Sequence, residues 1–306
     1  MNGTFHHVKA STQYKREHKS DYGRERMDIL YEDANIVVIH KPSGMLSVPY
    51  PGSKARTALD VLEKIMRTKG TYSSAHRPFT VHRLDRDTSG VMMFALTEAV
   101  QTKVMDSWHT MVTERLYRAV AENPRNPKKI LPVSGLIDLP LAKNSHHLGY
   151  VPHDPHDKNK TVEARTYFSV VFRGATHTLF ELSLDTGKKN QIRAHLSSQG
   201  YPLAGDENYR ARTDPFHRLA LHARTLAFVH PVTHEPLRFE VPEPEEWLLY
   251  VQRGDRHPQT PIWFDREAQR QMRQSYTNSS PVPAPRLSRK QRSKMDFIAQ
   301  AHALQK

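Results

Sequence analysis

Cysteine is entirely absent from this chain of 306 residues. Its absence excludes disulfide bonds, thiolate catalysis, and zinc or iron–sulfur centres with cysteine ligands. Long apolar runs are missing too, and none reaches the roughly 18 residues that a membrane-spanning helix needs. The first residues, Met1 to Gln13, hold no apolar stretch of the kind found in a secretory signal. We therefore expect a soluble, cytoplasmic protein without a membrane partner.

Negative charge is in short supply. The chain has 45 lysines and arginines against 32 acidic residues, which gives a formal net charge of +13 at pH 7. A protein that neutralises phosphates with basic side chains releases counterions, so a basic excess favours binding to a polyanion. A basic surface can also serve solubility alone. Nucleic acid is the partner that the charge indicates.

Composition divides the chain into three parts. Residues 1–26 are basic and almost without large aliphatic side chains, which predicts a disordered arm. Residues 266–306 begin with a segment that leads into the Ser- and Pro-rich stretch 279–285, and they end in a basic tail. Between them, residues 27–265 are long enough to bury a sizeable core as one domain.

Hydrophobic periodicity within this domain predicts both strands and helices. Helices are expected at residues 57–67, 97–111 and 191–198, where apolar side chains recur at intervals of three and four. Strands are expected at residues 36–39, 91–96, 116–120, 178–184, 226–229 and 237–241. No regular βαβ repeat links them. The sequence therefore predicts an α+β fold with a mixed, mostly antiparallel sheet flanked by helices and loops.

The most informative segment is residues 82–90, with the sequence HRLDRDTSG. It sets Asp85 and Asp87 two positions apart, each beside an arginine, directly before an apolar strand. A neighbouring cation favours the ionised form of an acid, and an ionised acid at the edge of a buried strand suits a nucleophile or a base. A structural ion pair is the plain alternative. A metal-binding acidic pair is opposed by the two arginines.

Several strings resemble the RluA-type RNA pseudouridine synthases and follow one another in that family's order. The resemblance spans roughly residues 28–247, and it is carried by HKPSGM at 40–45, HRLDRDTSG at 82–90, RLYRA at 115–119, TGKKNQIRAH at 186–195, LAGD at 203–206 and RLALHA at 218–223. It implies the pseudouridine synthase fold and the isomerisation of uridine to pseudouridine in ribosomal or transfer RNA. It implies no cofactor and no metal.

The resemblance also assigns roles within the site. Asp85 is expected to be catalytic, and Arg193 to pair with it through the fixed fork of a guanidinium. Tyr117 is expected to lie against the target base, where its hydroxyl could relay a proton, although a phenol of pKa near 10 is a poor base. Asp87 is rejected as the nucleophile and expected to cap a turn.

Four further residues are expected to bind RNA or to help evert the target base. His82 and Arg83 either fill the position that an everted uridine leaves, or bond to the turn. Lys188 and Lys189 precede a helix start, where free amides and positive charge favour phosphate. The family usually has arginine at position 188 and histidine at position 190, where this chain has Asn190. That departure concerns the phosphate contact rather than the chemistry.

Other functions stay open at this stage. A non-catalytic RNA-binding or ribosome-assembly factor could keep the same fold, and an N-glycosidase could use the same aspartate to release free uracil. The cluster His146, His147, His153 and His156 could hold zinc, but it lies among prolines and is expected to be an exposed insertion. A monomer is expected, although no feature of the sequence fixes the oligomeric state.

Overall fold

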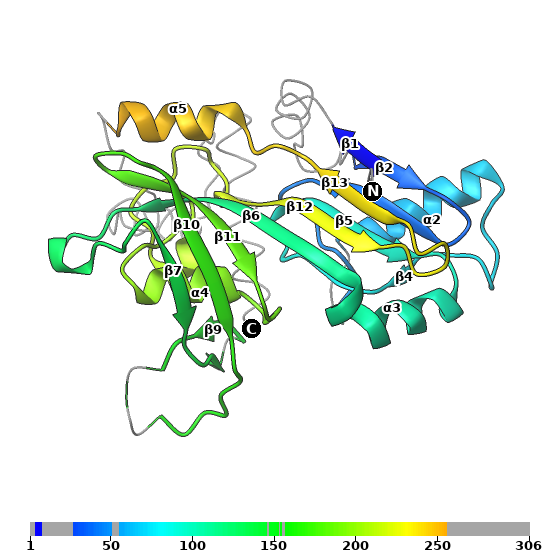
Figure 1. The fold of residues 1–306 in the computed structure, drawn as a ribbon, viewed down its shortest axis with the longest axis horizontal. Helices are drawn as coiled ribbons and strands as arrows, with labels where there is room; N and C mark the ends of the chain where they lie inside the picture. Colours follow the sequence, from blue (N-terminus) through cyan, green and yellow to red (C-terminus); the bar gives the residue numbers. More distant parts are fainter. Residues whose placement is uncertain are drawn as a thin grey trace, which may run out of the picture.

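An eleven-stranded sheet runs through the molecule in a computed structural model that describes residues 4–7, 27–50, 55–145, 147–152, 154 and 157–255 (Figure 1). The main path has the order β2-β3-β5-β12-β6-β11-β10-β7. Among the described strands two pairs are parallel, β5 with β12 and β1 with β13. The predicted mixed, mostly antiparallel sheet is confirmed. The strands are β1 (Thr4–His7), β2 (Asp28–Glu32), β3 (Ile36–Lys41), β4 (Phe79–Thr80), β5 (Ser89–Ala95), β6 (Val112–Glu122), β7 (Ser134–Asp138), β10 (Arg165–Arg173), β11 (His177–Leu184), β12 (Leu221–Val229) and β13 (Pro236–Glu240).

Two helices cover opposite faces of β3 and β5. The helix α2 (Ala58–Lys69) begins at Thr57, which forms a capping box with Asp60, and α3 (Glu98–Met111) begins at Thr97, whose hydroxyl accepts from the third helical amide. Every residue of β3 and β5 is buried. A strand that is covered on both faces needs an unbroken apolar run, which is what made these two strands visible in the sequence.

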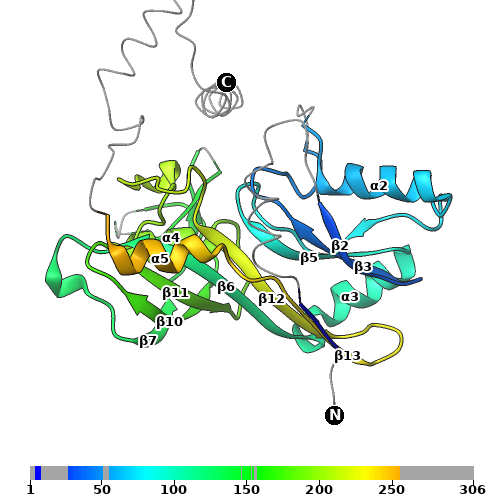
Figure 2. The ribbon, with the colours of Figure 1, turned by 90° about the horizontal axis from the view of Figure 1, so that it is seen from above.

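The other half of the sheet is covered in the same way. The helix α4 (Gln191–Ser198) packs Ile192 and Leu196 against β6 and β11 on one face. The helix α5 (Glu245–Arg253) packs Trp247 and Val251 against the other face of these strands. Figure 2 shows α2 and α3 at one end of the molecule and α4 and α5 at the other, with β6 and β12 running between them. Smaller elements are η1 (Pro127–Lys129), η2 (Glu207–Tyr209) and the two-stranded sheet of β8 (Ala142–Lys143) and β9 (Gly149–Tyr150).

The two halves meet where β5 lies beside β12. Two residue pairs form this parallel contact, Ser89 with His222 and Gly90 with Ala223. A Cβ atom at Gly90 would lie 2.1 Å from the carbonyl oxygen of Ala223, and the φ of Gly90 is 125°. Only glycine allows so close an approach at that backbone angle. The next strand, β6, sets Tyr117 opposite Ala223. The segment that ends in β5 and the tyrosine of β6 therefore come together at this junction.

The structure adds elements that the sequence did not predict, and it leaves some of the predictions untested. The strands β7 and β10 and the helix α5 were not predicted. Four residues of the N-terminal arm form β1, while the rest of residues 1–26 and all of 256–306 lie outside the described residues, so the disorder of the arms and the domain boundaries stay predictions. His146, His153 and His156 also lie outside them. No helix in the described ranges is long and apolar enough to cross a membrane.

Candidate active site

A cavity of about 450 Å³ opens at the junction of the two halves of the sheet. Its walls come from the segment between β4 and β5, from β6, from α3, and from the start of α4. The volume lies within the range of about 300–1,000 Å³ that is usual for small-molecule sites. All the site residues predicted from the sequence line this cavity, namely His82, Arg83, Asp85, Tyr117, Lys188, Lys189 and Arg193.

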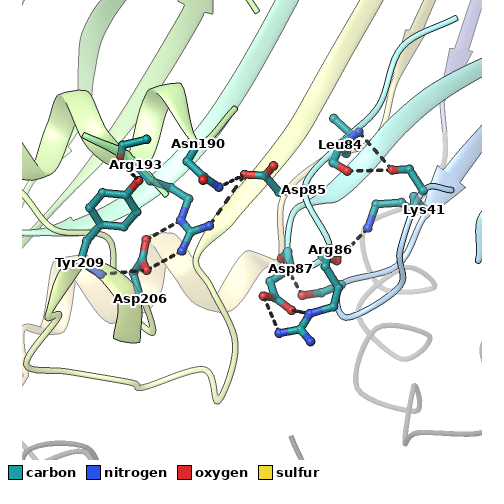
Figure 3. A network of polar contacts seen from close by, with 12 residues as sticks. Lys41, Leu84, Asp85, Arg86, Asp87, Asn190, Arg193, Asp206 and Tyr209 are labelled. Atoms are coloured by element: carbon teal, nitrogen blue, oxygen red, sulfur yellow. Dashed lines mark hydrogen bonds and ion pairs between the residues drawn. The ribbon is translucent and has the colours of Figure 1, made fainter. Parts of the chain in front are cut away.

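Asp85 is held by two side chains from the first turn of α4 and the residue before it. The Nδ2 atom of Asn190 donates to Oδ2 of Asp85 over 2.7 Å, and the Nη1 atom of Arg193 lies 3.7 Å from the same oxygen. Figure 3 shows both contacts ending on one carboxylate oxygen. The side chain of Asp85 is 28% exposed while that of Arg193 is 7% exposed. The carboxylate thus reaches the cavity with its partners buried behind it.

The prediction that Arg193 binds Asp85 through two nitrogens of its guanidinium is wrong, because only Nη1 lies near Asp85. The fork closes on Asp206 instead, with Nε donating to Oδ2 over 2.7 Å and Nη2 to Oδ1 over 2.8 Å. Burial lowers the pKa of Arg193, but the charge and hydrogen bonds of Asp206 outweigh it, so the net shift is upward. Arg193 is a permanent cation whose third nitrogen is turned to Asp85. Asp206 lay in one of the strings quoted above, where no role was given to it.

Tyr117 lines the cavity and packs, partly buried, against two apolar clusters. Burial raises the pKa of its hydroxyl, and the charge of Asp85 adds to this rise while Arg115 opposes it. A phenol whose pKa is raised above 10 is ionised even less often at neutral pH, so less of the phenolate is present to accept a proton. The ring is therefore suited to contact a base by its face, and the proton-relay role loses support.

His82 is built into the wall rather than presented as a cation. Its Nε2 atom accepts from the amide of Met93 in β5 over 3.0 Å, and its ring lies 4.8 Å from the ring of Trp108 on α3. Burial, with a contribution from Arg115, lowers the pKa of His82 to about 3. A neutral ring that is fixed by a backbone hydrogen bond cannot hold phosphate by charge. The structural alternative for His82 is favoured, although its partner is a strand and not the turn.

Arg83, Lys188 and Lys189 form a basic rim. All three side chains are exposed, and within the described part of the chain none of them pairs with an acid. The lysines directly precede the start of α4 at Gln191, as expected. These three residues line the same cavity as Asp85. Exposed cations there could meet the phosphates of a bound chain.

A buried lysine supports the segment that carries Asp85. The Nζ atom of Lys41 donates to the carbonyl oxygens of Pro42, Met45 and Arg86 over 2.7 to 2.9 Å. Lys41 has no exposed surface, and this burial lowers its pKa to about 7. Lys41 of the HKPSGM string thus supports the backbone of the segment that carries Asp85, a role that the sequence did not indicate.

Asp87 does not line the cavity, and Figure 3 shows its carboxylate beside the guanidinium of Arg86. Its carboxylate accepts from Nε and Nη2 of the adjacent Arg86 over 3.1 and 3.3 Å. The expected turn cap through its side chain is therefore wrong, and the turn is closed by the Thr88 amide, which donates to the carbonyl of Asp85 over 3.2 Å. The rejection of Asp87 as a nucleophile agrees with this position. In the described residues no group of three or more histidine, aspartate or glutamate side chains could hold a metal ion.

Comparison with known proteins shows the family to which this chain belongs. The model of the RNA pseudouridylate synthase family matches residues 35–198. The chain belongs to the RNA pseudouridylate synthase family. The uncharacterized RNA pseudouridine synthase YlyB of Bacillus subtilis is 35% identical over 227 residues, which cover 74% of this chain and 72% of that protein. The ribosomal large subunit pseudouridine synthase D of Pseudomonas aeruginosa is 34% identical over 246 residues, which cover 75% of this chain and 73% of that protein.

Solved structures support the same fold. Human RNA pseudouridylate synthase domain containing 4 superposes with a TM-score of 0.57 at 22% identity, covering 82% of this chain and 98% of that chain. Human RNA pseudouridylate synthase domain containing 1 also gives a TM-score of 0.57 and covers 85% of this chain. Family membership confirms the resemblance on which the site was predicted. This pseudouridine synthase is an RNA-modifying isomerase.

Proposed function

We propose that this pseudouridine synthase isomerises uridine in large-subunit ribosomal RNA and that Asp85 is its catalytic carboxylate. The observation that supports this proposal most strongly is the position of Asp85. Its carboxylate lines a cavity of about 450 Å³, and Asn190 and Arg193 contact it from the start of α4. The choice of ribosomal RNA over transfer RNA rests on the similarity to the large subunit enzyme of Pseudomonas aeruginosa. Cytoplasmic location follows from that substrate, and the monomer expected from the sequence stays a prediction.

The reaction sets three demands on the site. The glycosidic bond must break, the uracil must turn, and it must rejoin through carbon 5, with no atom gained or lost overall. The carboxylate of Asp85 supplies the group that acts on the sugar or the base, and the cation of Arg193 lies 3.7 Å from its Oδ2 atom. Tyr117 lines the cavity with a flat, partly buried ring against which a uracil can stack.

Access to the target also fits the surface of the cavity. A stacked uridine must be everted to reach Asp85, which costs a few kcal/mol. Phosphate contacts at Arg83, Lys188 and Lys189 can offset this cost because each neutralised phosphate releases counterions. These contacts carry no sequence information in themselves, so the shape of the RNA would select the uridine.

The substrate is tested by mapping pseudouridines in cellular RNA with and without this gene. The proposal expects the loss of one or a few sites from large-subunit ribosomal RNA, and their return when the gene is restored. A loss confined to transfer RNA would reject the ribosomal substrate. Release of free uracil by the purified enzyme would indicate hydrolysis in place of isomerisation, and an unchanged map would favour an RNA-binding role.

A further inference from the structure

The shortest contact to the catalytic carboxylate comes from a neutral side chain. Asn190 donates to Oδ2 of Asp85 over 2.7 Å, whereas the nearest nitrogen of Arg193 is 3.7 Å away and its other two donors are taken by Asp206. The direct hydrogen bond that orients Asp85 is therefore the amide of Asn190. This contact joins residues 105 positions apart in the chain, so no local pattern in the sequence could indicate it.

The backbone around Asn190 is arranged for this contact at some cost. Asn190 stands at the N-terminus of α4 in the left-handed region, with φ 57° and ψ 20°, and its side chain makes no capping hydrogen bond. An asparagine at that position ordinarily caps and stabilises the helix by a side-chain hydrogen bond. The amide oxygen of Asn190 is also buried and accepts no hydrogen bond within the described part of the chain. In the described part of the chain, the side chain of Asn190 therefore makes its hydrogen bond to Asp85 and none to the helix or through its own oxygen.

Packing behind the residue fixes its place. Asn190 is 5% exposed. A Cβ atom at Gly149 in β9 would lie 2.6 Å from the carbonyl oxygen of Lys189 and 3.7 Å from Cβ of Asn190, so β9 contacts this segment directly. The hydroxyl of Tyr209 in turn donates to the carbonyl of Gly149. Asn190 therefore has little freedom to turn away from the cavity.

We propose that Asn190 is a positioning residue that fixes Oδ2 of Asp85 and leaves Oδ1 as the oxygen that faces the uridine. In the described residues Oδ1 has no hydrogen-bond partner, while both contacts end on Oδ2 (Figure 3). A neutral amide orients the carboxylate by a direct hydrogen bond without adding a second full positive charge beside it. This inference rests on the proposed function, because it assigns Asn190 a role in the reaction of Asp85.

Two variants separate this role from a structural one. Asn190→Gly removes the donor at a backbone angle that glycine adopts freely. Asn190→Asp keeps the shape but replaces the donor by a second carboxylate, and aspartate also tolerates the left-handed region. The assay measures tritium released from carbon 5 of [5-³H]uridine in a transcript of large-subunit ribosomal RNA, under single-turnover conditions and across pH. RNA affinity and thermal stability are measured alongside.

The chain offers a matched control for each variant. His234→Gly makes the same kind of change at an exposed left-handed residue, φ 62°, in the turn between β12 and β13. Asn159→Asp breaks an analogous contact outside the cavity, where Nδ2 of Asn159 donates to Oδ1 of Asp157 over 2.8 Å. Both controls should keep the wild-type rate and pH profile.

The expected result is a loss of rate without a loss of binding. Asn190→Gly should lower the single-turnover rate about 10- to 100-fold, the range for a hydrogen bond to a charged group, with RNA affinity within about twofold. Asn190→Asp should also move the acid side of the pH profile upward by about one unit, because two carboxylates at one site resist ionising together.

Three results would overturn the inference. They are variant rates within about twofold of wild type, a rate loss that only follows weaker RNA binding, and an unmoved acid limb in Asn190→Asp. If the wild-type enzyme releases no tritium from any RNA, the proposed function fails and this inference falls with it. A wild-type enzyme that is active, beside an inactive Asp85→Asn, keeps the two questions apart.

Discussion

Asp206→Asn should destabilise this enzyme far more than the loss of an ordinary surface ion pair. The carboxylate of Asp206 is 1% exposed and binds Arg193 through two hydrogen bonds of 2.7 and 2.8 Å. Each hydrogen bond to a charged group contributes about 1.5–3 kcal/mol, and breaking a buried ion pair costs about 3–5 kcal/mol. Asp85, at 3.7 Å, remains as a second counterion for Arg193. Its attraction is worth about 4 kcal/mol at an effective dielectric constant near 20.

We therefore expect a loss of about 3 kcal/mol in the free energy of unfolding, at the lower end of that range, and a melting temperature lower by roughly 10 °C. Urea denaturation of the full-length chain measures the free energy. Asp85→Asn should cost more in the Asp206→Asn background than alone, because it then removes the last counterion of Arg193.

A matched control is Asp185→Asn, which breaks an equally short but exposed bridge to Arg165 and should change stability little. If Asp206→Asn unfolds within about 1 kcal/mol of wild type, or if the two substitutions are additive, the account of Arg193 as a cation shared by two carboxylates is wrong.

Three other predictions follow from buried or exposed charges. Burial lowers the pKa of His82 to about 3 and the pKa of His177 to about 4. Below pH 6.5 these two histidines therefore bind protons in the unfolded chain but stay neutral in the folded chain. This contribution to stability is complete above pH 6.5 and should fall by about 2 kcal/mol per histidine at pH 5, and urea midpoints that do not change between pH 7 and pH 5 would contradict it. Lys41→Met leaves three carbonyl groups of the support without their donor, so unfolding in urea should show a loss of about 3 kcal/mol, while wild-type stability would mean that the ammonium does not hold this segment. Lys188→Gln combined with Lys189→Gln should weaken RNA binding and reduce the slope of log K against log salt by about 1.4 to 1.8, and an unchanged slope would show that neither lysine meets a phosphate.

The parts of the fold that the sequence predicted are those with an unambiguous burial pattern. The strands β3 and β5 are buried on both faces and read as continuous apolar runs, and α2 has a polar cap, a regular apolar face and a terminal glycine. The strand β10 was missed because Tyr167, Val171 and Phe172 are apolar yet exposed, which breaks the alternation. The helix α5 follows a proline-rich stretch and shows only two fully covered side chains.

In the site as well, the residues that belong to a motif could be predicted from the sequence, whereas the contacts that only the fold creates could not. The strings of the sequence brought Asp85, Tyr117 and Arg193 to attention, and all three line one cavity. The partner of the Arg193 fork and the contact of Asn190 with Asp85 were not foreseen. The first contact joins α4 to a residue 13 positions further along, and the second joins residues 105 positions apart. Both depend on how α4 is set against these loops, which no local pattern encodes.

We expect one carboxylate, that of Asp85, to perform the isomerisation, and not that of Asp87 two positions along. Tritium release from [5-³H]uridine should be measured for Asp85→Asn and for Asp87→Asn under the same conditions. Asp87 is a matched control because its carboxylate binds Arg86 and does not line the cavity. Asp85→Asn should lose at least about a thousandfold in rate, whereas Asp87→Asn should stay within a few-fold of wild type. Equal rates for Asp85→Asn and the wild type would contradict this expectation.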